Sequence, residues 1–149
     1  MTKEVLVSIS GLQFEIEEDE AVEVISVGEY YCKNGKHYII YEDMISDEKG
    51  EHELTKNTLK ISNHQVDVMK KGSANVHMIF EENKKNMTYY NTPFGELLIG
   101  IYTTSISLTE QEDEILLQVE YVLDVNYNHV SDCVITIKIS AKEQQKDLL

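Results

Sequence analysis

A strict alternation of apolar and polar side chains between Glu114 and Tyr127 constrains the fold of this chain more than any other feature. Successive side chains of a β-strand point to opposite faces, so one face of this segment is predicted to meet a core and the other to meet water. The even positions are mostly polar. The odd positions, predicted to point inward, are Ile115, Leu117, Val119, Tyr121, Leu123, Val125 and Tyr127.

The same period of two recurs on both sides of this segment. A polar turn over residues 126–132 is predicted to lead into a further strand. Upstream, residues 96–108 form another long β-branched and aliphatic segment, closed by the acidic turn at 109–113. The apolar face of the strand that follows the polar turn comprises Cys133, Ile135, Ile137, Ile139 and Ala141.

Turn residues divide the rest of the chain into shorter strands. Asn34-Gly35, between two apolar runs, is the strongest hairpin signal. Connections are short, and the crossover helices that a parallel sheet requires are missing. The sequence therefore predicts an all-β fold: a single closed antiparallel up-and-down β-barrel of 8–10 strands over residues 1–141, with a polar C-terminal tail at 142–149. The earlier strands are predicted at 4–14, 21–32, 36–45, 58–62, 65–70, 76–82 and 87–91.

Net charge argues against two classes of partner. Thirteen basic residues and 27 acidic ones give a formal net charge of −14, which opposes binding to nucleic acid and to an anionic membrane surface. All the basic residues are lysine, so the planar fork of arginine, which grips carboxylate or phosphate at two points, is absent. No nucleic-acid or membrane partner is expected.

The N-terminal residues and the cysteines indicate a compartment. Polar Lys3, Glu4 and Ser8 interrupt the first apolar stretch, which excludes a signal peptide. No stretch approaches the roughly 18 apolar residues of a membrane-spanning helix. Cys32 and Cys133 are expected to be reduced thiols. These features predict a soluble cytoplasmic protein.

Motifs of catalysis and metal binding are missing from the sequence. It contains no Gly-x-Ser-x-Gly elbow, Walker loop or Rossmann motif, and no His-x-x-x-His or Cys-x-x-Cys spacing. The acidic runs 17–20 and 110–114 are interpreted as solvated turns. No catalytic residue, cofactor or metal site is predicted, and an enzyme is not favoured. The histidines are scattered at His37, His52, His64, His77 and His129.

Tyrosine is the residue type that suggests a ligand site. Tyr102 and Thr104 share the parity of Ile106 and Leu108 and are predicted to point inward. A barrel of this size is filled by side chains or holds one small ligand, which polar groups on the wall would orient. Alternatively, aromatic residues simply favour strands and bury their hydroxyls against local backbone. The candidate ligand-binding residues are Tyr102, Thr104, Tyr121 and Tyr127.

Several stretches between Gly28 and about Val125, the most specific being Tyr90-Asn91-Thr92-Pro93-Phe94-Gly95, resemble the YwiB-like family of bacterial calycin-type β-barrels, a domain of unknown function. The resemblance implies a lipocalin-like meander barrel and no established activity. Lys71 stands where that family often carries arginine before a glycine-serine pair. The matching stretches are Gly28-Glu29-Tyr30-Tyr31, Tyr38-Ile39-Ile40-Tyr41-Glu42, Thr58-Leu59-Lys60-Ile61, Val68-Met69-Lys70-Lys71-Gly72-Ser73, Tyr90-Asn91-Thr92-Pro93-Phe94-Gly95 and Leu117-Gln118-Val119-Glu120-Tyr121.

The leading functional hypothesis is a non-enzymatic barrel that binds a small apolar or amphipathic molecule in its interior. The alternative is a protein–protein interaction module, as a homodimer or with another partner, that uses the barrel exterior. Leu116 and Val122 are the candidate interaction residues, because they are apolar on an otherwise polar face. A third hypothesis is a hydrolase or lyase with a carboxylate–tyrosine site at the barrel mouth.

Overall fold

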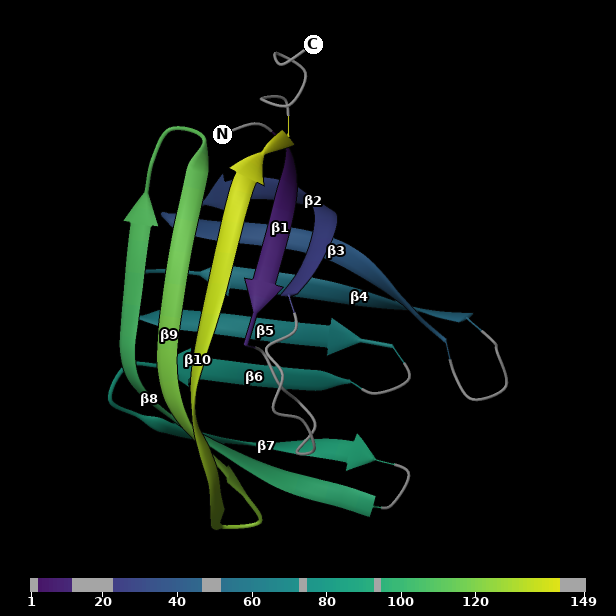
Figure 1. The fold of residues 1–149 in the computed structure, drawn as a ribbon, viewed down its shortest axis with the longest axis vertical. Coiled ribbons are helices and arrows are strands. Elements are labelled where there is room, and N and C mark those ends of the chain that lie inside the picture. Colours follow the sequence, from purple (N-terminus) through teal and green to yellow (C-terminus); the bar gives the residue numbers. More distant parts are fainter. Residues whose placement is uncertain (1–2, 12–22, 47–51, 73–74, 93–94, 143–149) are drawn as a thin grey trace.

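The computed structural model describes residues 3–11, 23–46, 52–72, 75–92 and 95–142, and these form an all-β antiparallel barrel (Figure 1). The predicted fold class is thus confirmed. Residues 143–149 of the predicted tail and the acidic run 17–20 lie outside the described residues. The described strands are β1 (Glu4–Ser10), β2 (Glu23–Lys33), β3 (Lys36–Ser46), β4 (His52–Ile61), β5 (Gln65–Lys71), β6 (Val76–Glu81), β7 (Lys85–Thr92), β8 (Gly95–Glu110), β9 (Glu114–Val125) and β10 (Asn128–Ala141).

The strands form one sheet in the order β6-β5-β4-β3-β2-β1-β10-β9-β8-β7. Apart from β6 and β7, consecutive strands are neighbours in the sheet, and β1 also pairs with β10, the last strand. Within the described residues no ladder joins β6 to β7, although these strands are consecutive. The barrel is therefore nearly closed, with one seam between β6 and β7.

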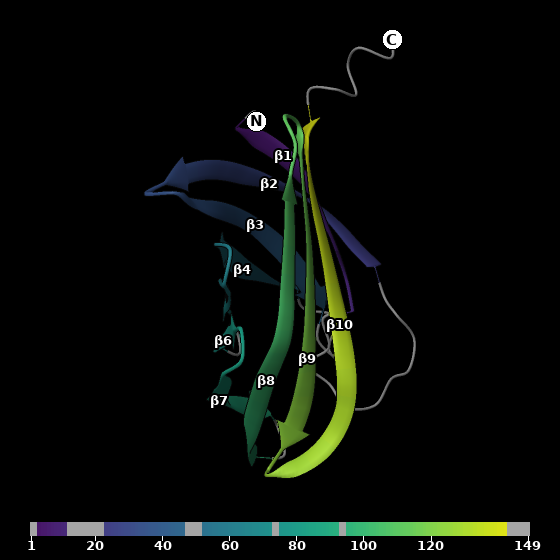
Figure 2. The ribbon, with the colours of Figure 1, turned by 90° about the vertical axis from the view of Figure 1, so that its left-hand side faces the viewer.

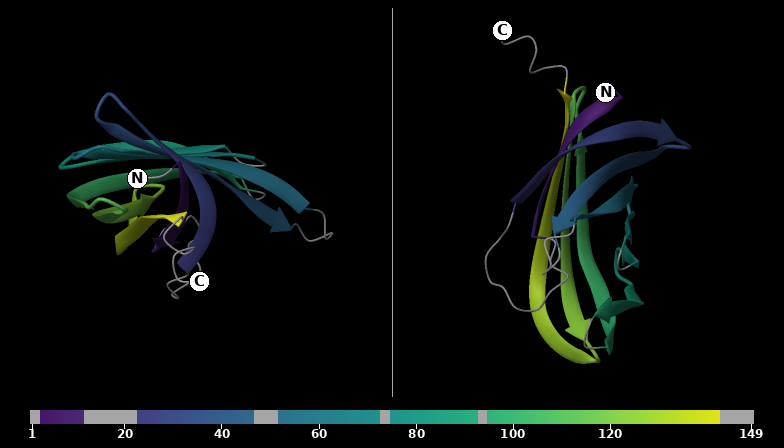
Figure 3. Two further views of the ribbon diagram at one scale, coloured as in Figure 1. Left: turned by 90° about the horizontal axis from the view of Figure 1, so that it is seen from above. Right: turned by 90° about the vertical axis from the view of Figure 1, so that its right-hand side faces the viewer.

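Two layers of strands make up the barrel wall. Strands β1, β8, β9 and β10 run along the long axis, and β3 to β6 cross behind them (Figures 1 and 2). Seen from above, the layers lie face to face (Figure 3). The wall must therefore turn sharply where one layer passes into the other.

Strand β2 turns this corner at Gly28. Its ladder with β1 runs from Glu23 to Glu29, whereas its ladder with β3 begins only at the pair Gly28–Tyr41. A Cβ atom at position 28 would lie 3.0 Å from the carbonyl oxygen of Ile40 and 3.2 Å from Cγ2 of Val7. Glycine thus permits the close approach of the strands that the corner requires.

Strand β8 turns the opposite corner through a β-bulge. Thr103 pairs with Tyr121 and Ser105 pairs with Glu120, so Thr104 is an extra residue in the ladder. An extra residue reverses the faces of all later side chains. Accordingly, Ile99, Ile101 and Thr103 are buried before the bulge, whereas even-numbered side chains point inward after it.

The turn between β9 and β10 is tighter than predicted. Val125 pairs with Asn128, which leaves Asn126 and Tyr127 as a two-residue loop. Both have positive φ, 49° and 69°, as a type I′ turn demands. The predicted turn over residues 126–132 is therefore wrong, because β10 begins at Asn128. The first residues of β10 include Asn128, Ser131 and Asp132, which are typical of turns, so the start of the strand was placed too late.

The inner faces of both layers form one apolar core. The alternation in β9 is confirmed from Ile115 to Val125, since each odd position there is buried. Burying a large aliphatic side chain stabilises a fold by roughly 1.5–3 kcal/mol, so this face alone fixes the register of β9. In β4, Thr55 and Asn57 occupy inner positions. These polar residues broke the alternation, which explains why β4 was predicted to start at residue 58 instead of His52.

Candidate functional site

The structure separates the four residues predicted to line the interior. Tyr121 is buried, with 1% of its surface exposed. Tyr102 is 40% exposed and Tyr127 is 78% exposed, and Thr104 also lies on the surface. The inward orientation predicted for these three is wrong, because the bulge reverses the parity of β8 and Tyr127 occupies a turn.

Three buried polar side-chain atoms belong to inner residues of the neighbouring strands β7, β8 and β9. The Tyr121 hydroxyl, the Thr103 hydroxyl and Nδ2 of Asn86 are buried and have no hydrogen-bond partner among the described residues. Thr103 lies directly opposite Tyr121 in the β8–β9 ladder, and Asn86 lies opposite Ile101, two residues before Thr103. Diagonal neighbours on one face of a sheet are close enough to interact. We call Asn86, Thr103 and Tyr121 the inner polar cluster.

The surroundings of the cluster keep the tyrosine neutral. The ring of Phe80 on β6 packs edge-on against Tyr121, with 5.0 Å between ring centroids. Burial raises the pKa of Tyr121, and the neighbouring Cys133 thiol raises it further. The Cys133 thiol interacts with the hydroxyl, but a thiol is a weak hydrogen-bonding group, so it does little to satisfy it. Tyr121 therefore remains a phenol that can donate a hydrogen bond.

Leaving such atoms unpaired is costly. A buried polar group without a partner costs about 1–3 kcal/mol, and most buried polar groups in proteins are bonded to protein or ordered water. Each atom of the cluster can donate a hydrogen bond: two are hydroxyls and one is an amide nitrogen. The arrangement is suited to binding an acceptor oxygen within an apolar wall.

A second polar group on the inner wall is already bonded. Tyr41, Asn57 and Lys70 lie side by side across β3, β4 and β5. Nζ of Lys70 donates to Oδ1 of Asn57 at 2.9 Å, and Nδ2 of Asn57 donates to the carbonyl oxygen of Thr55 at 3.4 Å. Sequence analysis missed this row, because its inward lysine stands beside an exposed one, Lys71, in a run that looks like a charged turn.

A chain of hydrogen bonds lies at one end of the barrel. The Tyr30 hydroxyl lies 2.7 Å from Nδ1 of His37, and Nε2 of His37 bonds the carboxylate of Glu110. The carboxylate accepts the Nε2 proton, so Nδ1 accepts from Tyr30. Burial raises the pKa of Tyr30, and Cys32 and Glu110 raise it further. This chain ties the end of β8 to the β2–β3 hairpin.

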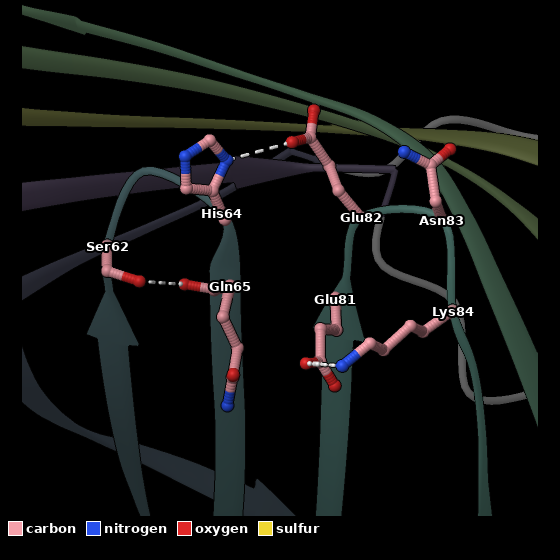
Figure 4. A pocket seen from close by; sticks show the side chains of 7 residues that line it. All are labelled: Ser62, His64, Gln65, Glu81, Glu82, Asn83 and Lys84. Carbon is pink, nitrogen blue, oxygen red and sulfur yellow. Dashed lines mark hydrogen bonds and ion pairs between the residues drawn. The ribbon is translucent and has the colours of Figure 1, made fainter.

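A polar corner closes the seam between β6 and β7. A depression of about 430 Å³ is lined by the β4–β5 and β6–β7 turns (Figure 4). Nδ1 of His64 lies 3.0 Å from Oε1 of Glu82, and Nζ of Lys84 lies 2.9 Å from Oε2 of Glu81. Glu82 also accepts the backbone amide of Ile106 on β8 at 3.0 Å. Glu82 thus fastens the β6–β7 turn both to β8 and to the β4–β5 turn, while Lys84 and Glu81 pair within their own turn.

The outer face carries the two predicted interaction residues. Leu116 is 41% exposed, whereas Val122 is half-buried. They are six residues apart on β9, which corresponds to about 20 Å at 3.4 Å per residue, so they do not form one patch. Other exposed apolar side chains gather nearer Val122, on β7, β8 and β10: Met87, Tyr89, Tyr102 and Val134.

Within the described ranges, no group of three or more His, Cys, Asp or Glu side chains is arranged to hold a metal ion. The same part of the chain contains no helix that is long and apolar enough to cross a membrane.

Comparison with known proteins identifies relatives. The family model described as "Domain of unknown function (DUF1934)" matches residues 7–137. The "Uncharacterized beta-barrel protein YwiB" of Bacillus subtilis (strain 168) is 29% identical over 128 residues, which cover 81% of this chain and 85% of that protein. The crystal structure of the ywiB protein from Bacillus subtilis matches with a TM-score of 0.67 at 23% identity, over 93% of this chain and 89% of that one. The structural match shows a shared fold.

Proposed function

The chain belongs to the DUF1934 family, and from that premise we propose that it binds a small apolar or amphipathic molecule inside its barrel. Membership confirms the resemblance seen in the sequence and supports a barrel architecture shared with YwiB. Fold alone does not determine function, so the proposal rests on the wall of this particular barrel.

The inner polar cluster is the observation that carries the proposal. Thr103 and Tyr121 are 0% and 1% exposed, and their hydroxyls have no hydrogen-bond partner in the part of the chain that the structure describes. A bound molecule that offers an acceptor atom would satisfy them, and the apolar side chains around them would bury its body. Ordered water could satisfy the same atoms, and the experiment below separates the two occupants.

Native mass spectrometry of protein purified from cells tests the proposal. The wild type is expected to carry an added mass that is lost on denaturation. The double variant Thr103→Val/Tyr121→Phe removes both inner hydroxyls and is expected to lose that mass. The matched control Thr104→Val/Tyr102→Phe alters exposed neighbours on β8 and is expected to keep it. An added mass that persists in the inner variant would count against the site, and a wild type without any added mass would count against the proposal.

Self-association through the outer face is a second candidate function. The observation that favours it is the pair of exposed apolar side chains next to Val122: Tyr102, its partner in the β8–β9 ladder, is 40% exposed, and Val134 on β10 is 47% exposed. Exposed apolar patches often mark interaction surfaces. Size-exclusion chromatography with light scattering tests this candidate: Tyr102→Lys is expected to convert a dimer to a monomer, whereas Leu116→Lys, about 20 Å from Val122, is expected to leave the dimer intact. A wild type that is monomeric at all concentrations excludes the dimer.

A further inference from the structure

We infer that the ligand is an uncharged molecule that presents an acceptor oxygen, such as a ketone, aldehyde, ester or amide, to the inner polar cluster. This inference deepens the proposed function and rests on it. It concerns what the head of the ligand must be, given the side chains that line this part of the wall.

Donor chemistry favours an acceptor oxygen. Nδ2 of Asn86 can only donate, and the hydroxyls of Thr103 and Tyr121 can donate as well as accept. A carbonyl oxygen has two lone pairs and no proton, so it can accept a hydrogen bond from any of these donors. A hydrocarbon would leave all three atoms unpaired, at the full cost of burying them.

The inward side chains next to the cluster are uncharged, which disfavours a ligand with an anionic head group. The inward neighbours of the cluster on β8, β9 and β10 are apolar: Ile101, Val119, Leu123 and Ile135. A buried carboxylate without a cation is strongly unfavourable. The chain has no arginine, and its net charge is −14.

Lysine does not reach this part of the wall. Lys70, the inward lysine of β5, bonds Asn57 and lies opposite Val76. Val76 is four residues from Phe80, the residue on β6 that packs against Tyr121, a separation of about 13 Å along the strand. A carboxylate at the cluster would therefore lack a counter-charge, whereas a neutral carbonyl needs none.

Ligands with one tail and different heads test the inference. Octane, methyl hexyl ketone and octanoate share a chain of eight carbon atoms and would be compared at pH 8 by displacement of prodan, an uncharged fluorescent aryl ketone. Methyl hexyl ketone is expected to bind at least about tenfold more tightly than octanoate. The reason is that burying the carboxylate of octanoate without a counter-charge costs more free energy than one hydrogen bond contributes. Thr103→Val/Tyr121→Phe is expected to weaken binding of the ketone by about tenfold and to leave binding of octane unchanged.

Controls separate the inference from the function on which it rests. Thr104→Val/Tyr102→Phe is expected to bind all ligands like the wild type, and urea unfolding confirms that each variant is folded. Octanoate binding as tightly as the ketone, or ketone affinity that is equal in the wild type and the inner variant, would overturn the inferred ligand class but leave interior binding standing. If prodan and all three ligands fail to bind, both the inference and the proposed function are wrong.

Discussion

At the scale of single residues, one position in a ladder decides whether a tyrosine faces the core or the solvent. Tyr121 and Tyr102 lie on adjacent strands, yet they are 1% and 40% exposed. Tyr102 pairs with Val122, one position along β9 from Tyr121, so the two tyrosines lie on opposite faces of the sheet. On the inner face, the hydroxyls of Tyr121 and Thr103 and the amide nitrogen of Asn86 are buried and able to donate, and they have no hydrogen-bond partner among the described residues.

The cost of an unpaired hydroxyl gives a first prediction. Tyr121→Phe is expected to raise the free energy of unfolding of ligand-free protein by about 1 kcal/mol, because it removes a buried group that has no partner. Urea unfolding of protein refolded without ligand measures the change. Tyr102→Phe, on the surface, is expected to change stability by less than about 0.5 kcal/mol. A Tyr121→Phe variant less stable than wild type would mean that the hydroxyl is satisfied.

Backbone strain at Tyr127 gives a second prediction. This residue has φ of 69° in a type I′ turn, a conformation that costs a non-glycine residue about 1–2 kcal/mol. Tyr127→Gly is expected to stabilise the protein by about 0.5–1 kcal/mol, after the greater flexibility of glycine in the unfolded chain is deducted. Thermal unfolding checks this. Asn126→Gly is the matched comparison and is expected to gain less, since asparagine tolerates positive φ; an equal or larger gain there would contradict the explanation.

At the scale of elements, alternation predicted most strands but not the irregularities that shape the barrel. The long, regular runs in β9 and β10 were visible because each inward position is apolar. The bulge in β8 was not visible, since Thr103-Thr104-Ser105 has no side-chain contrast between its two faces. The start of β4 was missed because Thr55 and Asn57 are polar and inward.

The polar corner between the β4–β5 and β6–β7 turns gives a third prediction, which concerns the pH dependence of stability. Hydrogen bonds from His64 and from the backbone of Ile106 lower the pKa of Glu82. A carboxyl whose pKa is lower in the folded state stabilises that state at pH above its unfolded value of about 4.3. The contribution is lost as the pH falls through the folded-state value. Glu82→Gln is therefore expected to be less stable than wild type at pH 7 and to approach wild type in acid.

Urea unfolding midpoints of wild type and Glu82→Gln, measured from pH 7 down to about pH 3, check this prediction. Glu120→Gln, an exposed carboxyl on β9, is the control and is expected to show a smaller difference at pH 7. A difference in unfolding midpoint between wild type and Glu82→Gln that stays constant or widens in acid would show that the carboxylate does not stabilise the contact between the β6–β7 turn and β8.

At the scale of the whole molecule, a meander of antiparallel strands was predictable, whereas the site was only partly so. Of the residues proposed from sequence, Tyr121 alone lies in the inner polar cluster. Asn86 and Thr103 were missed because their role depends on cross-strand register, to which a single sequence gives no access. The network of Tyr30, His37 and Glu110 joins residues 73 positions apart at its longest link, between His37 and Glu110, and was equally invisible.

The central claim is that the inner polar cluster holds a molecule inside the barrel. A high-resolution crystal structure of protein purified from cells, with no ligand added, tests it most directly. We expect continuous electron density within hydrogen-bonding distance of the hydroxyls of Tyr121 and Thr103, extending between the apolar side chains of the two layers. An interior in which both hydroxyls bond protein groups or isolated waters, with no space for a larger molecule, would contradict the claim.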